Sequence, residues 1–87
     1  MNDWGLPNRH NADEAAADAA IREVLHRYCW CIDAFDDDLL LELFTPDGEC
    51  WRAGEEPLLG RSQIAGFLRA RDGAVVGRHI ASNIVID

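Results

Sequence analysis

The sequence predicts an α+β domain in which helices lie against one face of an antiparallel sheet. Three stretches space their apolar residues as amphipathic helices do, and the last stretch alternates apolar and polar residues as a strand does. Turn residues separate these stretches. A chain of 87 residues is long enough for one domain and no more.

The composition is acidic, with sixteen Asp and Glu against eight Lys and Arg and a net charge of -8. An acidic surface repels phosphate groups, so we expect neither a nucleic-acid partner nor a membrane partner. No apolar run could cross a bilayer and no secretory signal begins the chain, which predicts a cytoplasmic protein. No phosphate-binding glycine loop or metal-ligand spacing occurs, so we expect no cofactor and no metal.

We expect residues 1–11 to form a flexible arm and residues 12–87 to form the domain. The first helix should span residues 12–34, because alanines and acidic residues open it and an apolar face follows. That face comprises Ile21, Val24, Leu25, Tyr28, Cys31, Ile32 and Phe35.

An acidic run, Asp36–Asp38, begins the second predicted helix. Asp36 can cap this helix, and the acids that follow suit the positive end of its dipole. We favour this interpretation over a calcium site, because oxygens on consecutive helical positions fan outward. A type I turn is predicted over Thr45–Gly48, with Pro at its second position and Gly at its fourth.

The remaining predicted elements are short, apart from the last. They are a strand at residues 49–53, an extended piece at 58–59, a helix capped by Ser62 that ends near Ala70, and a strand at 75–87. Side chains of a strand alternate between its faces, so His79 and Asn83 should share one face of the last strand.

Five spans, taken in order and spacing, resemble the SnoaL-like branch of the nuclear transport factor 2-like superfamily. They are Ile21–Tyr28, Ile32–Asp36, Leu43–Gly48, Leu59–Leu68 and Arg78–Asn83. The resemblance implies a cone, in which a strongly curved antiparallel sheet wraps the long N-terminal helix and encloses an apolar pocket. It also implies that the chain is the N-terminal part of such a domain, truncated after the strand that carries His79, and that the full-length form is a homo-oligomer.

The resemblance further implies three catalytic residues. Asp33 and His79 match an Asp–His pair of dehydratase and dehydrochlorinase members, and Tyr28 matches a tyrosine of the bile-acid dehydratase type. These residue types suit an elimination. An imidazole can take a proton from carbon, a carboxylate can fix its tautomer, and a phenol can donate a hydrogen bond to a carbonyl or to the departing oxygen.

Each of these residues also has a purely structural interpretation: a polar strand histidine, a turn aspartate and a core tyrosine. Tyr28 and Asp33 lie about 140° apart around an ideal helix, so both reach one pocket only if it wraps the helix end or the last turn is distorted. For substrate binding, we expect Trp51 to form a pocket wall and Asn83 to offer a polar contact.

The sequence therefore favours a cofactor-independent lyase of the dehydratase type, acting on a small hydrophobic or polycyclic molecule. One alternative is a non-catalytic ligand-binding or structural subunit that resembles the small subunit of a ring-hydroxylating dioxygenase. Another is an inert fragment. An isomerase of the same superfamily is disfavoured, because such enzymes carry a carboxylate base on the first strand, where this chain has Arg52, which cannot accept a proton.

Overall fold

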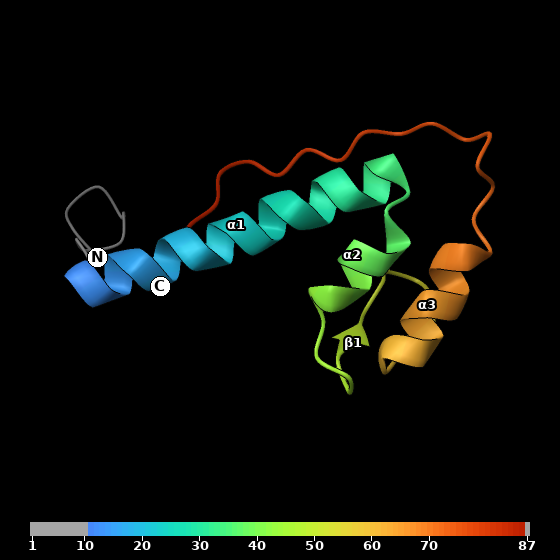
Figure 1. The fold of residues 1–87 in the computed structure, drawn as a ribbon, viewed down its shortest axis with the longest axis horizontal. Coiled ribbons are helices and arrows are strands. Elements are labelled where there is room, and N and C mark those ends of the chain that lie inside the picture. The colour runs from blue at the N-terminus through green and yellow to red at the C-terminus, as the bar shows by residue number, and fades with distance from the viewer. Residues whose placement is uncertain (1–10, 87) are drawn as a thin grey trace.

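The computed structural model describes residues 11–86. Its elements, in chain order, are α1 (Ala12–Ala34), α2 (Asp37–Glu42), β1 (Glu49–Cys50), β2 (Leu58–Leu59) and α3 (Arg61–Arg69). In Figure 1, α1 forms a long rod, and α2, β1 and α3 gather on one side of its C-terminal end. The predicted α+β class with a long N-terminal helix is confirmed. The arm predicted for residues 1–11 lies outside the described residues, apart from Asn11.

The ends of α1 are set by side-chain and backbone capping. At its start, the Asn11 side chain accepts the N–H of Glu14 at 2.9 Å, which satisfies one of the free donors of the first turn. At its end, Phe35 adopts a left-handed conformation (φ 58) and donates its N–H to the Cys31 carbonyl oxygen. The chain then turns sharply, and the side chain of Asp36 caps α2 as predicted, by accepting the N–H of Leu39.

Within residues 11–86, the sheet is an antiparallel pair of strands, in which Glu49 lies opposite Leu59 and Cys50 opposite Leu58. The turn predicted before β1 is present, because the N–H of Gly48 donates to the Thr45 carbonyl at 2.9 Å. The predicted Ser62 cap is wrong. Gly60 takes the N-cap position with a φ of 83, so the chain turns earlier and α3 has already begun at Ser62.

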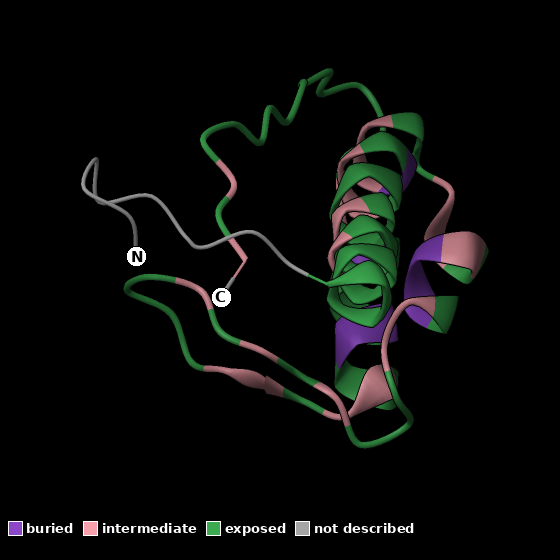
Figure 2. Ribbon diagram, turned by 90° about the vertical axis from the view of Figure 1, so that its left-hand side faces the viewer, coloured by how far each residue is buried: buried purple, intermediate pink, exposed green. Residues whose placement is uncertain are grey.

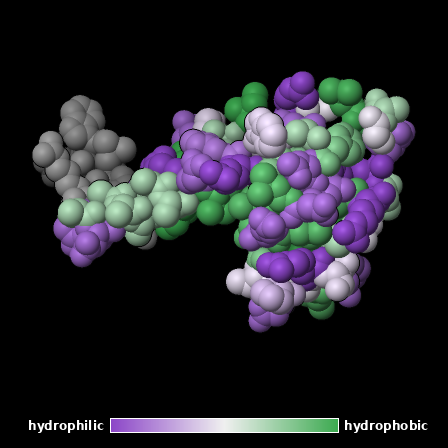
Figure 3. All heavy atoms as spheres, viewed as in Figure 1, coloured by the Kyte–Doolittle hydropathy of each residue, from purple (hydrophilic) through white to green (hydrophobic). Residues whose placement is uncertain are grey.

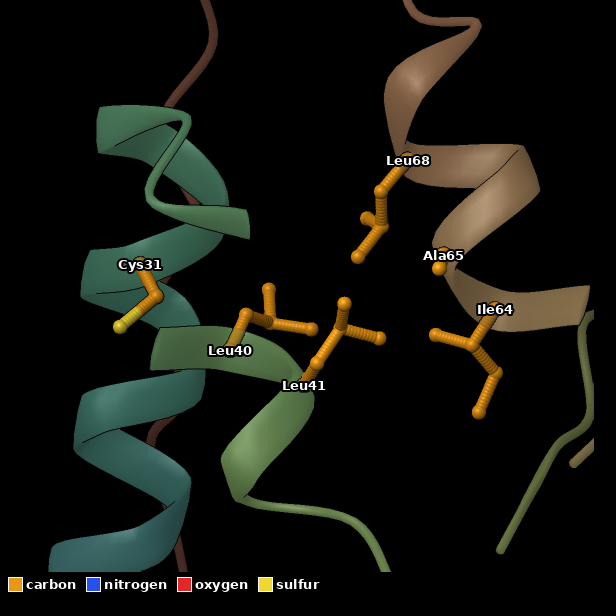
Figure 4. Close-up of a cluster of buried hydrophobic side chains, with 6 residues drawn as sticks. All are labelled: Cys31, Leu40, Leu41, Ile64, Ala65 and Leu68. Carbon is orange, nitrogen blue, oxygen red and sulfur yellow. The ribbon is translucent and has the colours of Figure 1, made fainter. Parts of the chain in front are cut away.

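The core lies between the C-terminal half of α1, α2 and α3 (Figure 4). Its buried residues are Cys31, Leu40, Leu41, Ile64, Ala65 and Leu68. In Figure 2 the buried residues are confined to the helices, whereas the strands and the C-terminal segment are exposed or half-buried. The packing of the three helices therefore forms the core, and the strands and the C-terminal segment lie at its surface.

The N-terminal half of α1 does not share in this core. Ile21, Val24 and Leu25 are exposed, although they belong to the same predicted apolar face as Tyr28 and Ile32, which pack on the core. Figure 3 shows this half of the helix projecting from the body of the molecule. None of the described helices is long and apolar enough to cross a membrane.

The strand predicted at residues 75–87 is wrong, because residues 75–86 form an irregular segment. This segment passes along α1 and ends beside its N-terminal half (Figure 1), where Arg22 donates to the Ile84 carbonyl at 3.0 Å. An alternating sequence becomes a strand only when a neighbouring strand pairs with its backbone. Within residues 11–86, the sheet consists of β1 paired with β2, and residues 75–86 pair with neither strand.

Candidate functional site

Asp33 and His79 are in direct contact, although 46 positions separate them in the sequence. The Nδ1 atom of His79 lies 2.5 Å from Oδ1 of Asp33, and the backbone N–H of His79 donates to Oδ2 at 2.8 Å. The carboxylate thus binds one residue through both its oxygens. The Asp33 side chain is largely sheltered at 14% exposure, whereas the His79 side chain is 52% exposed.

Two turns bring the pair together. Asp33 lies in the last turn of α1, immediately before the helix ends. After α3, Asp72 forms a tight turn, accepting the N–H of Ala74 on its side chain at 2.9 Å and the N–H of Val75 on its backbone carbonyl at 3.1 Å. This turn sends the irregular segment back along α1, which places His79 over Asp33.

The pKa of the Asp33 carboxyl is lowered, first by the hydrogen bond from the His79 side chain and then by the bond from its backbone. Asp33 is therefore ionised at neutral pH and can only accept hydrogen bonds. It follows that Nδ1 of His79 carries a proton. The other ring nitrogen, Nε2, has no hydrogen-bond partner among the described residues, so it is the atom available to a ligand.

An apolar cavity of about 260 Å³ lies beside His79. It is lined by Tyr28, Ile32, Leu40, Phe44, Cys50, Arg52, Leu58, Ile64, Phe67, Leu68 and His79. The Tyr28 ring packs edge-on against Phe44, with ring centroids 6.4 Å apart. Burial, followed by the neighbouring Cys50 and Cys29 thiols, raises the pKa of Tyr28. Its hydroxyl therefore keeps its proton at neutral pH and can serve as a hydrogen-bond donor.

A second cavity of about 290 Å³ includes Asp33, Arg71 and His79 in its lining. His79 and Ile32 line both cavities. Tyr28 faces the first cavity and Asp33 the second, as their angular separation on a helix requires. Tyr28 and Asp33 therefore line different cavities, and His79 is the predicted site residue that lines both.

The structure does not place Trp51 and Asn83 as predicted. Trp51 is 73% exposed, its Nε1 donates to Oε2 of Glu49 at 3.0 Å, and it is not among the residues that line the first cavity. Asn83 is exposed and adopts a φ of 56. A left-handed residue interrupts the strand alternation that was to align it with His79.

Arg52 is the lining residue that sequence reasoning missed. Side chains alternate along extended chain, so Cys50 and Arg52 share a face opposite to that of Trp51, and both line the first cavity. The sequence signal was this period of two, which pairs Arg52 with the half-buried Cys50. Within residues 11–86, no three His, Cys, Asp or Glu side chains gather as a metal site would require.

The long N-terminal helix and the small antiparallel sheet define an α+β domain. The sequence matches the SnoaL-like domain family over residues 13–87. The chain therefore belongs to the SnoaL-like domain family of the nuclear transport factor 2-like superfamily, as the resemblance predicted. This family contains polyketide cyclases and dehydratases, and domains of the superfamily often bind small hydrophobic ligands and form oligomers.

One solved structure supports the same assignment. The chain is similar to the crystal structure of an NTF2-like protein with a cystatin-like fold from Novosphingobium aromaticivorans, with a TM-score of 0.54 and 28% identity. The match covers 74% of this chain and 46% of that protein, so the chain spans less than half of its length. No curated protein matches the chain.

Proposed function

We propose that the protein is a cofactor-independent lyase of the dehydratase type that acts on a small hydrophobic or polycyclic molecule. The observation that carries this proposal is the double contact of the Asp33 carboxylate with His79 at the wall of an apolar cavity. His79 is the base, Asp33 orients it and Tyr28 donates a hydrogen bond to the substrate.

The proposed reaction removes water across a carbon–carbon bond. Nε2 of His79 takes a proton from a substrate carbon, and the electron pair of that C–H bond becomes the second bond of the alkene. The adjacent C–O bond breaks, and the departing hydroxide takes the proton back from the imidazolium and leaves as water. Asp33 stabilises the imidazolium while it exists, as the carboxylate does in hydrolase triads.

The surroundings of the pair favour this chemistry. Tyr28 lines the cavity together with His79, and its raised pKa keeps the hydroxyl protonated. It can donate to a substrate carbonyl or to the departing oxygen. A hydrophobic substrate in the cavity excludes water from the reacting atoms, which strengthens each of these electrostatic interactions.

A second function is a non-catalytic ligand-binding or structural subunit. The observation that favours it is the 52% exposure of the His79 side chain, because water competes with a substrate for a base in an open position. In either function the partner is a small hydrophobic molecule, and we propose that the full-length form is a homo-oligomer.

The substitution Asp33→Asn separates the two functions. The assay incubates the protein with a panel of cyclic β-hydroxy ketones and records the ultraviolet absorbance of the conjugated alkene. We expect turnover by the natural protein, and a fall of about a hundredfold to ten-thousandfold in Asp33→Asn, because the imidazole loses its orienting charge.

The matched control is Asp38→Asn, because the Asp38 side chain is 95% exposed on α2. This control should turn over at the natural rate, and circular dichroism should show an unchanged helix content in both variants. Full activity of Asp33→Asn would remove Asp33 from the mechanism. Binding of the panel compounds without any alkene formation would favour the non-catalytic function.

A further inference from the structure

Of the described residues that line the first cavity, Arg52 is the only one with a permanently charged side chain. Apart from Tyr28 and His79, the other lining residues are apolar or cysteine. A guanidinium keeps its charge at any physiological pH. A fixed positive charge in the wall of an apolar cavity is unusual, because isolated charges favour water over such surroundings.

The hydrogen-bonding capacity of this guanidinium is largely unused. It has five N–H donors, and within residues 11–86 the bond it makes runs from Nη2 to the Glu56 carbonyl oxygen at 3.2 Å. Its Nε atom is buried without a hydrogen-bond partner. By contrast, Arg71 on the second cavity is paired with the Asp37 carboxylate at 2.7 Å. No carboxylate of the described chain forms an ion pair with Arg52.

The orientation of the Arg52 side chain is fixed before any ligand arrives. The guanidinium carbon lies 4.4 Å from the centre of the Phe67 ring, so one face of the group is stacked on α3. Stacking leaves the edge of the guanidinium, where the N–H groups lie, as the part that can bind an acceptor. A held guanidinium loses little further freedom when it binds.

We propose that Arg52 binds the carboxylate of a hydrophobic carboxylic acid in the first cavity. A carboxylate is acceptor-only and matches the fork of a guanidinium with two parallel hydrogen bonds. The chain's net charge of -8 disfavours anions over most of the surface, whereas the unpaired guanidinium of Arg52 attracts an anion into the cavity. This inference rests on the proposed function, because it makes the carboxylic acid the substrate whose carbon His79 deprotonates.

The test compares two probes of the same shape, naphthoate and the uncharged naphthamide, by isothermal titration calorimetry. The natural protein should bind naphthoate about tenfold to a hundredfold more tightly, which is the range of a charge-assisted hydrogen bond. In Arg52→Gln the two probes should bind equally. Arg52→Lys keeps the charge without the fork, so it should retain part of the preference for naphthoate.

The matched control is Arg69→Gln, which removes the same charge from a 65% exposed position on α3 and should keep the full preference. Equal binding of the two probes to the natural protein, no binding of naphthoate, or a preference that survives Arg52→Gln would each overturn the inference. Asp33→Asn should keep the preference for naphthoate. If the natural protein binds naphthoate through Arg52 but forms no alkene from any panel compound, the elimination is refuted and the carboxylate site stands.

Discussion

His79 is attached to Asp33 by two groups of different kinds, its imidazole and its backbone N–H. The backbone bond fixes where the residue lies, and the side-chain bond fixes how the ring is turned. Removing the imidazole leaves the backbone bond available. The effect of the imidazole on the pKa of Asp33 can therefore be measured while the backbone hydrogen bond still holds His79 in place.

The substitution His79→Ala should raise the pKa of Asp33 toward its ordinary value, because the His79 side chain is the largest cause of its lowering. The rise should be incomplete, since the backbone N–H still donates. Carbon-13 NMR of the Asp33 carboxyl over a pH titration measures this. His26→Ala, which removes an exposed histidine of α1, is the control and should leave the Asp33 titration unchanged.

The lowered pKa of Asp33 also makes the stability of the fold depend on pH. A carboxyl whose pKa is lower in the folded state stabilises the fold above its unfolded pKa, and that contribution disappears as pH falls through the folded value. The free energy of unfolding of the natural protein should therefore decline as pH drops below about 4, and His79→Ala should show a shallower decline there. Parallel profiles for the two proteins would mean that the ring does not stabilise the Asp33 carboxylate.

At the scale of the elements, Arg71 joins the three helices. Its guanidinium donates to the Ile32 carbonyl in α1 at 3.0 Å, to the Asp37 carboxylate in α2 at 2.7 Å and to the Leu68 carbonyl in α3 at 3.2 Å. It also lies 4.3 Å from the centre of the Phe35 ring. Because Phe35 ends α1 with a left-handed backbone, Arg71 stabilises the turn that orients α2.

The substitution Arg71→Met should lower the free energy of unfolding by about 2–3 kcal/mol, because it removes several hydrogen bonds of a charged, partly buried group and leaves Asp37 without its partner. Urea denaturation followed by circular dichroism measures the change. The control is Arg69→Met, whose Asp38 partner is 4.0 Å away and 95% exposed, and it should cost no more than about 0.5 kcal/mol. Equal losses in the two variants would mean that Arg71 does not hold the helices together.

The elements also mark how far sequence reasoning reaches. The bounds of α1 were predicted correctly, because alanine content, acidic first-turn residues and apolar spacing are local properties. The strand at residues 75–87 was not, since a strand depends on a partner that the alternation does not encode. In the site, Asp33, His79 and Tyr28 came from the resemblance to a family. Arg52 was missed because alternation does not say which of the two faces points inward.

At the scale of the whole molecule, the chain is extended for its length. Its radius of gyration is 15.7 Å, whereas a compact domain of this length has about 12 Å. The difference has two sources in the structure: the projecting N-terminal half of α1, and the irregular segment at residues 75–86. Both expose large apolar side chains, among them Ile21, Val76 and Ile80.

The same substitution should have very different effects on stability at an isoleucine in the core and at an isoleucine on the irregular segment. Ile64 is 2% exposed and Ile80 is 88% exposed. Ile64→Ser should cost about 3–5 kcal/mol of the free energy of unfolding, because it opens a cavity and buries a hydroxyl. Ile80→Ser should change it by less than about 0.5 kcal/mol.

The fluorescence of a hydrophobic dye such as anilinonaphthalene sulfonate reports the exposed surface in the same proteins. Ile80→Ser should lower the dye signal, because exposed apolar patches are where such dyes and other apolar molecules bind. Ala81→Ser, at the next and also exposed position, is the control and should leave the signal unchanged. If Ile80→Ser instead costs as much stability as Ile64→Ser, the segment packs against the domain in solution, and the Asp33–His79 pair is then held by more than its own two hydrogen bonds.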